Sequence, residues 1–424
     1  MSSERPSLFC LSAAQIHNRR VTQTQTSPER GRAALGPALE LIHTGAAPTR
    51  SALTGALGVT RTTVGAVTGE LEALRLITVD ARPAGAGRGR PSHRLEIDPH
   101  GPVVLAAQLH TDGFTLALAG LGGRLGQPLD LPLARLPKDT DPRVVLRTIA
   151  DEAMRLLAAS PRRCVGAGLA APTPVTEPER LAVISACLGW PTGTPIGELW
   201  QEVLHDAGLR LPDGVAPAVA NDANLAALAE HRHGAGRGAR HLLYVTAGHE
   251  GVGGALVVDG RLHTGSTGLA LEIGQLTVDP EGLQCRCGRR GCLDVEAGPP
   301  ALLTAYGLPK DAPLTEVDTI LAAARAGDRA AQAAVDHVAV RLGHGIAAVV
   351  DILNPDRVVL GPFHSALLAG APELLPETVA GRAHWGRFGC VPLRAAELPA
   401  PELAGAAELA WAPILADPQL VAVV

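Results

Sequence analysis

The chain has 424 residues, which is long for one domain and fits two or three. Hydrophobic residues make up 46% of it and aromatic residues 2%, so its cores must be built mainly from aliphatic side chains. It contains no apolar run of 18 residues or more and opens without a charged-then-apolar leader, which excludes membrane-spanning and secreted classes. We therefore expect a soluble, cytoplasmic protein with no membrane partner.

Charge is unevenly distributed along the chain. Residues 1–100 hold 12 Arg and 8 Asp or Glu, a net charge of +4, and the remaining residues hold 25 basic and 34 acidic groups, a net charge of −9. A basic head on an acidic body is weak evidence for a nucleic-acid partner. Residues 1–31 are rich in Ser, Thr, Gln and Arg without apolar periodicity, and they are predicted to form a flexible tail.

Residues 32–98 are predicted to form three short helices. Leu35, Leu39 and Ile42 share a helical face that ends at Gly45, with Pro37 expected in the first turn. A second helix is predicted over 49–57, and a turn at Gly58 separates it from a third helix. Thr60 is expected to cap that third helix, with Val64, Val67 and Leu71 on its buried side.

This helix, glycine turn and helix arrangement is typical of units that place their second helix in the major groove of DNA. The outward side chains expected to meet phosphates and base edges are Thr60, Arg61, Thr62, Thr63 and Thr68.

Two strands, expected at 76–79 and 93–97, bracket the segment P-A-G-A-G-R-G-R-P. Such a hairpin is typical of a wing, and we expect Arg88 and Arg90 at its tip to enter a minor groove. The alternative is a three-helix packing domain with a loop. The hypothesis for residues 32–98 is a winged helix-turn-helix that binds double-stranded DNA.

Within the body, A-P-A-V-A-N-D-A-N-L reads as an apolar strand that runs into a helix. Asn221 and Asp222 stand at the junction, where Asn224 helps cap the helix and the carboxylate of Asp222 can accept hydrogen bonds from a ligand hydroxyl. The alternative is that both residues cap the helix without any ligand.

Three cysteines, Cys285, Cys287 and Cys292, fall within eight positions, and Gly288 and Gly291 allow the backbone to turn tightly between them. Thiolates are soft ligands that suit Zn²⁺, whose structural sites normally have four ligands. The local sequence supplies three, so the fourth ligand stays open. The alternative is three reduced cysteines in a turn.

The segment from Glu272 to Asp294 resembles the zinc loop of the ROK family of repressors, open reading frames and sugar kinases. That family's pattern is E-x-G-H, followed ten positions after the histidine by C-x-C-G-x-x-G-C-L-E. Glu272 and the three cysteines fit it, whereas Gln275 stands where the family has its zinc-binding histidine and Asp294 where it has glutamate. The segment L-T-G-A-L-G-V-T-R-T-T-V also resembles the winged helix that opens ROK repressors.

The resemblance implies an α/β fold, with a winged helix-turn-helix at 32–98 and an actin-like (hexokinase/RNase H-like), two-lobed sugar-kinase-type domain at 99–424, its zinc loop at 272–294. ROK kinases carry D-x-G-G-T after the first strand of the body, where glycine amides approach ATP phosphates. This chain has His110, Thr111 and Asp112 in that neighbourhood, so the resemblance implies a degenerate kinase domain.

The function predicted from the sequence is a DNA-binding transcriptional regulator, a repressor rather than an enzyme, that binds an inverted-repeat operator as a homodimer or homotetramer. Its body would sense a sugar-like or other small effector, or serve oligomerisation. The alternative is an ATP-dependent sugar kinase with an appended DNA-binding domain, in which Asp222 is the general base. The effector residues that the resemblance implies are Asn221, Asp222, Glu272, Gln275 and Asp294.

Overall fold

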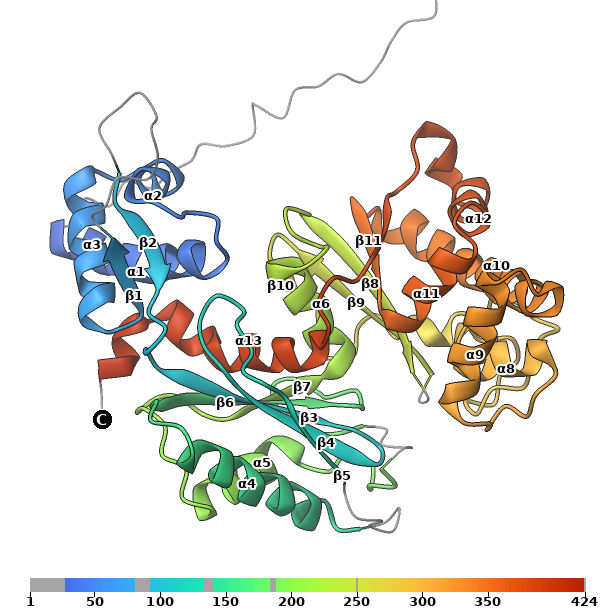
Figure 1. Cartoon of the computed structure of the whole chain (residues 1–424), viewed down its shortest axis with the longest axis horizontal. Helices are drawn as coiled ribbons and strands as arrows, with labels where there is room; N and C mark the ends of the chain where they lie inside the picture. Colours follow the sequence, from blue (N-terminus) through green and yellow to red (C-terminus); the bar gives the residue numbers. More distant parts are fainter. Residues whose placement is uncertain (1–26, 81–91, 133–139, 184–187, 249–250, 423–424) are drawn as a thin grey trace, which may run out of the picture.

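The computed structural model of the chain describes residues 27–80, 92–132, 140–183, 188–248 and 251–422 (Figure 1). Most of the predicted tail and the two arginines of the predicted wing, Arg88 and Arg90, lie outside these ranges.

Three helices and a two-stranded sheet form the N-terminal unit, which we define as residues 27–98. The predicted pattern of short helices followed by two strands is confirmed, and the antiparallel pairing of the strands sets Ile77 opposite Ile97. Gly58 turns the chain between the second and third helices with a φ of 64°, where a side chain would be strained. Thr60 caps the third helix by accepting a hydrogen bond from the Thr63 N–H group. The elements are α1 (Ser27–His43), α2 (Arg50–Leu57), α3 (Arg61–Ala73), β1 (Ile77–Asp80) and β2 (Arg94–Ile97).

Two expectations for this unit are wrong. Pro37 lies in the interior of α1 rather than in its first turn, and burial of Leu35 and Leu39 on either side offsets the hydrogen bond that a proline cannot donate. Thr68 was expected to face outward but is 0% exposed. Its hydroxyl donates to the Val64 carbonyl at 2.8 Å and accepts from Nε of Arg50 at 2.9 Å, so a buried threonine satisfies both roles of its oxygen.

The first lobe of the body is a five-stranded mixed sheet in the order β5-β4-β3-β6-β7. Side chains alternate along its strands: Leu105 and Ala107 face α4 and α5, whereas Val104 and Ala106 face α13. The elements are β3 (Val103–Leu109), β4 (Gly113–Ala119), β5 (Leu129–Pro132), α4 (Pro142–Ala158), β6 (Cys164–Ala171), α5 (Ile196–Asp206), β7 (Ala218–Asn221) and α13 (Pro401–Ala416).

The second lobe repeats this arrangement with a sheet in the order β10-β9-β8-β11-β12. Helix α6 covers one face through Ala226 and Ala227, and α10 and its neighbours cover the other. The strands and the helices next to them are α6 (Asp222–His233), β8 (His241–Gly248), β9 (Gly251–Val258), β10 (Arg261–Leu262), β11 (Arg357–Leu360) and β12 (Leu393–Ala395). The outer helices are α7 (Leu293–Glu296), α8 (Pro299–Tyr306), α9 (Leu314–Arg325), α10 (Arg329–Leu353), α11 (Pro362–Gly370) and α12 (Leu374–Arg382), with 3-10 turns η1 (Ile273–Gln275), η2 (His384–Phe388) and η3 (Pro418–Ala422).

Helix α10 is the one described helix that is long and apolar enough to cross a membrane by length and composition. Of its most apolar window, 61% is buried inside the fold, where Val335, Val338 and Leu342 are fully covered. Core helices of this kind pass the same test, so the pattern is weak evidence for a membrane span.

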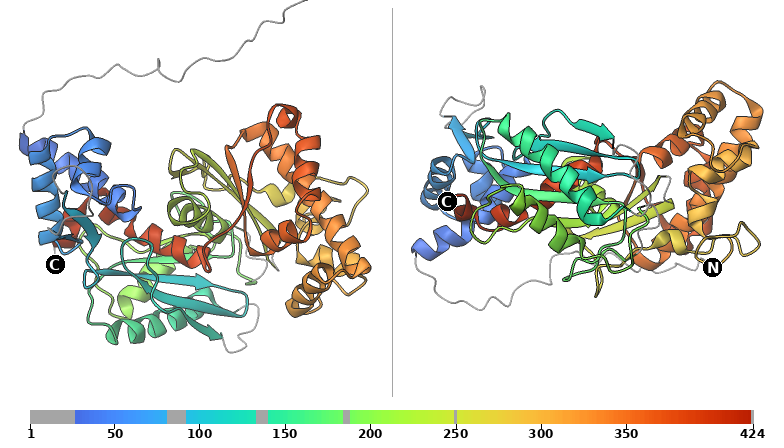
Figure 2. Two further views of the ribbon diagram at one scale, coloured as in Figure 1. Left: turned by 45° about the horizontal axis from the view of Figure 1, so that its top comes forward. Right: turned by 90° about the horizontal axis from the view of Figure 1, so that it is seen from below.

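Helix α13, near the C-terminus, packs against α1 of the N-terminal unit. It lies across the first lobe beside α6, and its C-terminal half runs beneath the N-terminal unit (Figures 1 and 2). Leu35 and Leu39 of α1 belong to the same hydrophobic cluster as Trp411 and Ile414 of α13. A Cβ atom at Gly36 would come within 2.6 Å of the Ala416 carbonyl oxygen. The backbones of α1 and α13 therefore approach closely at Gly36, where there is room only because glycine has no side chain. The N-terminal unit and the first lobe therefore share one core.

Candidate functional site

The N-terminal end of α3 carries most of the side chains predicted to contact DNA. Thr60, Arg61 and Thr62 are exposed, and Thr63 is half-buried. The hydroxyl groups of Thr60 and Thr63 lie 2.9 Å apart in a hydrogen bond. The exposed surface at the start of α3 is thus small, hydroxylated and cationic, without a large apolar side chain. Thr68 is not part of this surface, because it faces the interior between α2 and α3.

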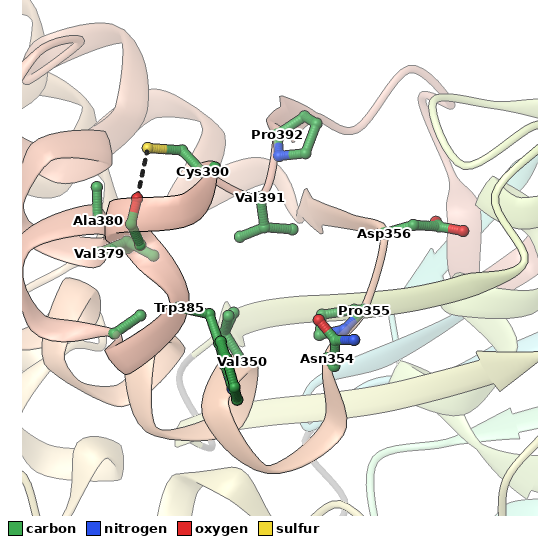
Figure 3. Close-up of a pocket in the computed structure, with 13 residues that line it drawn as sticks. Val350, Asn354, Pro355, Asp356, Val379, Ala380, Trp385, Cys390, Val391 and Pro392 are labelled. Atoms are coloured by element: carbon green, nitrogen blue, oxygen red, sulfur yellow. Dashed lines mark hydrogen bonds between the residues drawn. The ribbon is translucent and has the colours of Figure 1, made fainter. Parts of the chain in front are cut away.

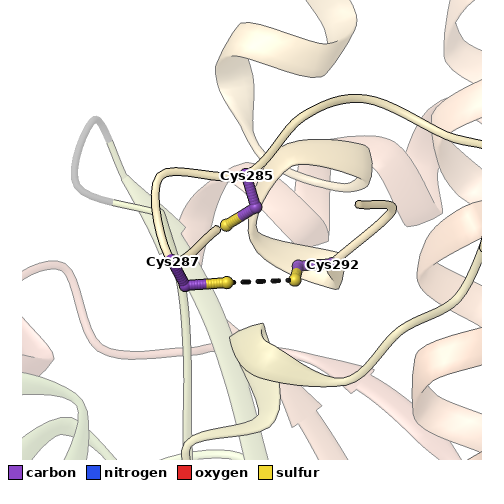
Figure 4. A group of neighbouring side chains, drawn as sticks. All are labelled: Cys285, Cys287 and Cys292. Atoms are coloured by element: carbon purple, nitrogen blue, oxygen red, sulfur yellow. Dashed lines mark hydrogen bonds between the residues drawn. The ribbon is translucent and has the colours of Figure 1, made fainter. Parts of the chain in front are cut away.

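The three cysteines of the predicted zinc loop lie together. Their Sγ atoms are all within 4.8 Å of one another, and the side chains point toward a common centre (Figure 4). Zn²⁺ held tetrahedrally at about 2.3 Å from each sulfur would set the sulfurs about 3.8 Å apart. The distance from Cys287 Sγ to Cys292 Sγ is 3.6 Å, which fits that geometry. Cys285, Cys287 and Cys292 can therefore hold three corners of a structural zinc site.

The backbone of this loop is held by buried Glu296 and by an ion pair between the partly buried side chains of Asp279 and Arg341. Glu296, 3% exposed, accepts a hydrogen bond from the Leu283 N–H group at 2.7 Å. Nη2 of Arg341 contacts Asp279 at 2.6 Å and so ties the loop to α10. Gly291 has a φ of 61° and packs against the Asp279 carbonyl, so any Cβ at this position would collide with the backbone.

Gln275 does not complete the metal geometry in this structure. Its Oε1 accepts a hydrogen bond from Nη2 of Arg289 at 3.3 Å. Hydrogen bonds from the main chain and side chain of Arg289 also lower the pKa of Cys287 to about 7. The amide oxygen is a weaker zinc donor than imidazole. Within the part of the chain that the structure describes, three thiolates therefore fit a zinc site, and Gln275 bonds Arg289 instead of supplying a fourth ligand.

Asn221 and Asp222 stand at the start of α6, between the two lobes. Asn221 caps the helix, its Oδ1 accepting from the Asn224 N–H group at 3.2 Å. Its Nδ2 donates to Oδ1 of Asp222 at 3.0 Å. Burial, and next the negative charge of Glu402, raise the pKa of Asp222 to about 7. A carboxyl group with this pKa can exchange a proton near neutral pH or hydrogen-bond a ligand hydroxyl.

The other predicted effector residues surround the first half of β9. Asp294, 8% exposed, accepts a hydrogen bond from the Val252 N–H group at 2.9 Å. The loss of solvent around Glu272, and next the charge of Asp294, raise the pKa of Glu272. On the opposite side of the same strand, a Cβ at Gly253 would lie 3.2 Å from Ala223, the neighbour of Asp222. The fold thus gathers α6, β9 and the cysteine loop at one place, although Asp294 is occupied with the backbone.

The turn between β3 and β4 lies where the sequence resemblance to ROK kinases predicts a phosphate loop. The His110 N–H group donates to the Gly113 carbonyl at 2.8 Å and closes the turn as a tight hairpin. His110 and Asp130 both bond the Thr115 hydroxyl, at 2.9 and 2.7 Å. In this turn the backbone amides are not presented as a glycine-rich cradle for phosphates. Pro362, at the start of α11, likewise has no N–H group to offer a nucleotide.

Two concave regions lie apart from these residues. One, with a volume of about 280 Å³, lies between the end of α10, α12 and the segment before β12, and includes Trp385 and Cys390 (Figure 3). A second, of about 660 Å³, opens between α1 and the end of α6 and includes Glu40, Arg232 and Arg237. None of the residues predicted to bind an effector lines either region.

A buried network that the sequence did not reveal joins α1, α6 and α13. Glu408, 1% exposed, accepts hydrogen bonds from Nε2 of His43 at 2.9 Å, Nε2 of His233 at 2.9 Å and Nη1 of Arg232 at 2.7 Å. Burial alone would raise the pKa of Glu408, but these donors outweigh it and hold the pKa well below its usual range. The network draws its members from α1, α6 and α13, three helices that are far apart in the sequence, so no local pattern signals it.

The possible ligand atoms of His43, His233 and Glu408 lie within 4.8 Å of one another, a spacing that also occurs in metal sites. Nδ1 of His43 accepts a hydrogen bond from the Gly122 N–H group at 2.9 Å, so Nε2 of the neutral ring carries the proton. That nitrogen then has no lone pair for a metal, and the Arg232 guanidinium already neutralises Glu408. The cluster is a hydrogen-bond network rather than a metal site.

Residues 122–367 match the model of the ROK family. A glucokinase of Halalkalibacterium halodurans is 40% identical over 34% of this chain and 47% of its own length. The putative xylose repressor of a Caldicellulosiruptor species is 27% identical over 64% of this chain and 69% of its own length. A solved ROK family transcriptional regulator, a homolog of the E. coli MLC protein, superimposes with a TM-score of 0.74 at 22% identity, over 93% of this chain and 98% of that one. The chain spans about half the length of the curated relatives that it matches first.

Proposed function

This chain belongs to the ROK family, since the family model matches more than half of it, and on that premise we propose that it is a DNA-binding transcriptional regulator. We assign the N-terminal unit to a winged helix-turn-helix and residues 99–424 to a kinase-like body. The predicted boundary of the tail at residue 31 moves to residue 26, because residues 27–31 are part of α1. The protein acts as a repressor, binds an inverted-repeat operator in double-stranded DNA, and does so as a homodimer or homotetramer.

The observation that carries this proposal is the geometry of α2, Gly58 and α3. The left-handed turn at Gly58 lets α3 project its capped N-terminal end, with Arg61 and Thr62 exposed. Helix-turn-helix units read base edges with the N-terminal residues of their second helix. The likeness in fold to a ROK transcriptional regulator covers 93% of this chain, which is more than the body alone makes up, and is consistent with the assignment.

The body supports a sensing role through α6. This helix begins at Asn221 and Asp222, beside the proposed effector site, and ends at Arg232 and His233, which bond Glu408 beneath α1. A ligand that favours one closure of the lobes would move α6, and with it the N-terminal unit. A sugar-like small molecule is the effector class that the repressor relatives suggest, and zinc held by the three cysteines would stabilise the neighbouring loop.

A second candidate, an ATP-dependent sugar kinase, is favoured by one observation. Asp222 occupies the position of the family's general base, and its pKa of about 7 suits proton abstraction from a sugar hydroxyl. The glucokinase relative supports the same candidate. The hairpin at 110–113 weighs against it, because phosphoryl transfer depends on donors that hold the transferred phosphate.

Genomic footprinting of the tagged full-length protein tests the proposal. Recovery of a shared inverted repeat upstream of genes is expected, with occupancy that changes when candidate sugars are supplied. A purified protein that ignores duplex DNA at about 50 mM salt, where phosphate contacts are strong, would overturn the assignment.

A further inference from the structure

Arg50, the first residue of α2, has an unusual environment for a surface arginine. Its Nε donates to the hydroxyl of Thr68 at 2.9 Å, and Thr68 is a fully buried residue of α3. That hydroxyl in turn donates to the Val64 carbonyl at 2.8 Å, which fixes the direction of its lone pairs. The guanidinium plane of Arg50 is therefore anchored at one edge against α3.

The main chain of Arg50 is anchored on the other side. Its N–H group donates to the His93 carbonyl at 3.1 Å, and the next N–H group, of Ser51, donates to the Ser92 hydroxyl at 3.0 Å. Ser92 and His93 are the residues where the connection from β1 re-enters β2. Arg50 thus lies between α3, the helix proposed to enter the major groove, and Ser92 and His93 at the base of the proposed wing.

The remaining donors of Arg50 are the atoms that matter for a ligand. Within the described ranges, hydrogen bonding uses Nε and the main-chain N–H group and leaves both Nη atoms uncommitted. An arginine held by Nε and free at its two Nη atoms presents a fork that matches phosphate oxygens. A recognition helix in the major groove and a wing in the adjacent minor groove have one sugar-phosphate strand between them.

We propose that Arg50 is a phosphate-binding residue that grips the DNA strand between the two grooves, and that buried Thr68 is the positioning residue that aims it. This inference rests on the proposed function and adds to it a contact at the N-terminus of α2. The ligand class is the phosphodiester backbone of duplex DNA, so the contact contributes affinity and register rather than sequence preference.

The test needs no operator, because backbone contacts dominate non-specific binding. A fluorescent duplex of random sequence is titrated with full-length protein at several salt concentrations. Arg50→Ala is expected to weaken binding about tenfold, the effect of losing a hydrogen bond to a charged group, and to lower the slope of log affinity against log salt by about one. Arg75→Ala is the matched control, since it removes the same charge at the far end of α3 and is expected to leave both quantities unchanged.

Thr68 is tested by the pair Thr68→Val and Thr68→Ser. The valine variant removes the hydroxyl at nearly constant volume, so affinity is expected to fall several-fold while the slope stays, because the charge of Arg50 is kept. The serine variant restores the hydroxyl and is expected to restore affinity. Adding Thr68→Val to Arg50→Ala is expected to have no further effect, since the two residues act as one unit.

The outcomes separate the inference from the function on which it rests. Wild-type protein that does not bind the duplex overturns both. Wild-type binding with the same affinity and slope in Arg50→Ala, or equal losses in Arg50→Ala and Arg75→Ala, overturns the phosphate contact alone. If Arg50→Ala loses its helical circular dichroism, the Arg50→Lys variant replaces it in the test. Arg50→Lys keeps the positive charge, so the salt slope is expected to stay. Because it lacks the bond from Nε to Thr68, it is expected to bind DNA less tightly than wild type.

Discussion

Glu408 and His43 are separated by 365 positions in the sequence, yet Nε2 of His43 donates a hydrogen bond to Oε2 of Glu408 over 2.9 Å. Both side chains are essentially inaccessible to water, with exposures of 1% and 0%. The bond fastens α1 of the N-terminal unit to α13 of the body at the point where α6 also arrives.

Glu408→Gln is expected to lower the free energy of unfolding by about 3 kcal/mol, because buried His43 and the partly buried Arg232 and His233 lose an ionised acceptor. Urea denaturation at pH 7 measures the effect. Glu40→Gln is the control, since the Glu40 carboxylate is 54% exposed and lies 3.6 Å from Arg232, and a change within about 1 kcal/mol is expected there. Equal losses in the two variants would contradict the importance of the buried network.

The contribution of Glu408 to stability has a predictable pH dependence. Its pKa is lower in the folded protein than in the unfolded chain, so the folded state favours the ionised form. The difference in unfolding free energy between wild type and Glu408→Gln is expected to be largest above about pH 4.3, the pKa of glutamate in the unfolded chain. It is expected to shrink as the pH falls through the pKa of Glu408 in the folded protein. Unfolding curves at pH 7, 5 and 3.5 check this, and a difference that grows on acidification would be the wrong sign.

Asp222 is expected to show the opposite dependence. Its folded pKa of about 7 lies above the unfolded value, so its stabilising effect is complete at low pH and is lost as the pH rises through 7. Asp222→Asn should therefore gain stability relative to wild type between pH 5 and pH 8. Asp213 is exposed, so the Asp213→Asn variant should show no such trend. If Asp213→Asn gained stability in the same way as Asp222→Asn, burial of Asp222 would not be the cause of the effect.

Zinc content tests the cysteine loop. Purified protein is expected to hold up to one zinc per chain, and the Cys285→Ser, Cys287→Ser double variant none, as measured by atomic emission. Cys390→Ser, an exposed cysteine outside the loop, is the control. Gln275→His supplies the imidazole that the family pattern has, so it is expected to slow zinc loss to a chelator. Zinc retained in the double variant would place the metal elsewhere.

Phosphoryl transfer tests the kinase alternative. Incubation with hexoses and labelled ATP is expected to yield no sugar phosphate, because the hairpin at 110–113 offers no glycine-rich cradle to the nucleotide. Turnover at about 1–100 per second, the ordinary range for kinases, would favour the enzyme over the regulator.

The sequence predicted those features that are encoded locally. Gly58, the Thr60 cap and the spacing of the three cysteines depend on nearby residues, and the structure places them as expected. Thr68 was misplaced because its hydroxyl suggested an exposed residue, although its position four residues after Val64 and three before Leu71 lies on the buried face of α3. Its hydroxyl is satisfied there by Arg50 from another helix. The Glu408 network was missed for the same reason, since its members come from three distant helices.

The shared core of α1 and α13 also bears on protein engineering. A fragment cut after residue 98 would uncover Leu35, Leu39 and their neighbours, and an exposed apolar stripe of that kind invites aggregation. Transplanting the N-terminal unit onto a different protein would therefore require carrying helix α13 along with it, so the two extremities of the polypeptide form a single exchangeable module.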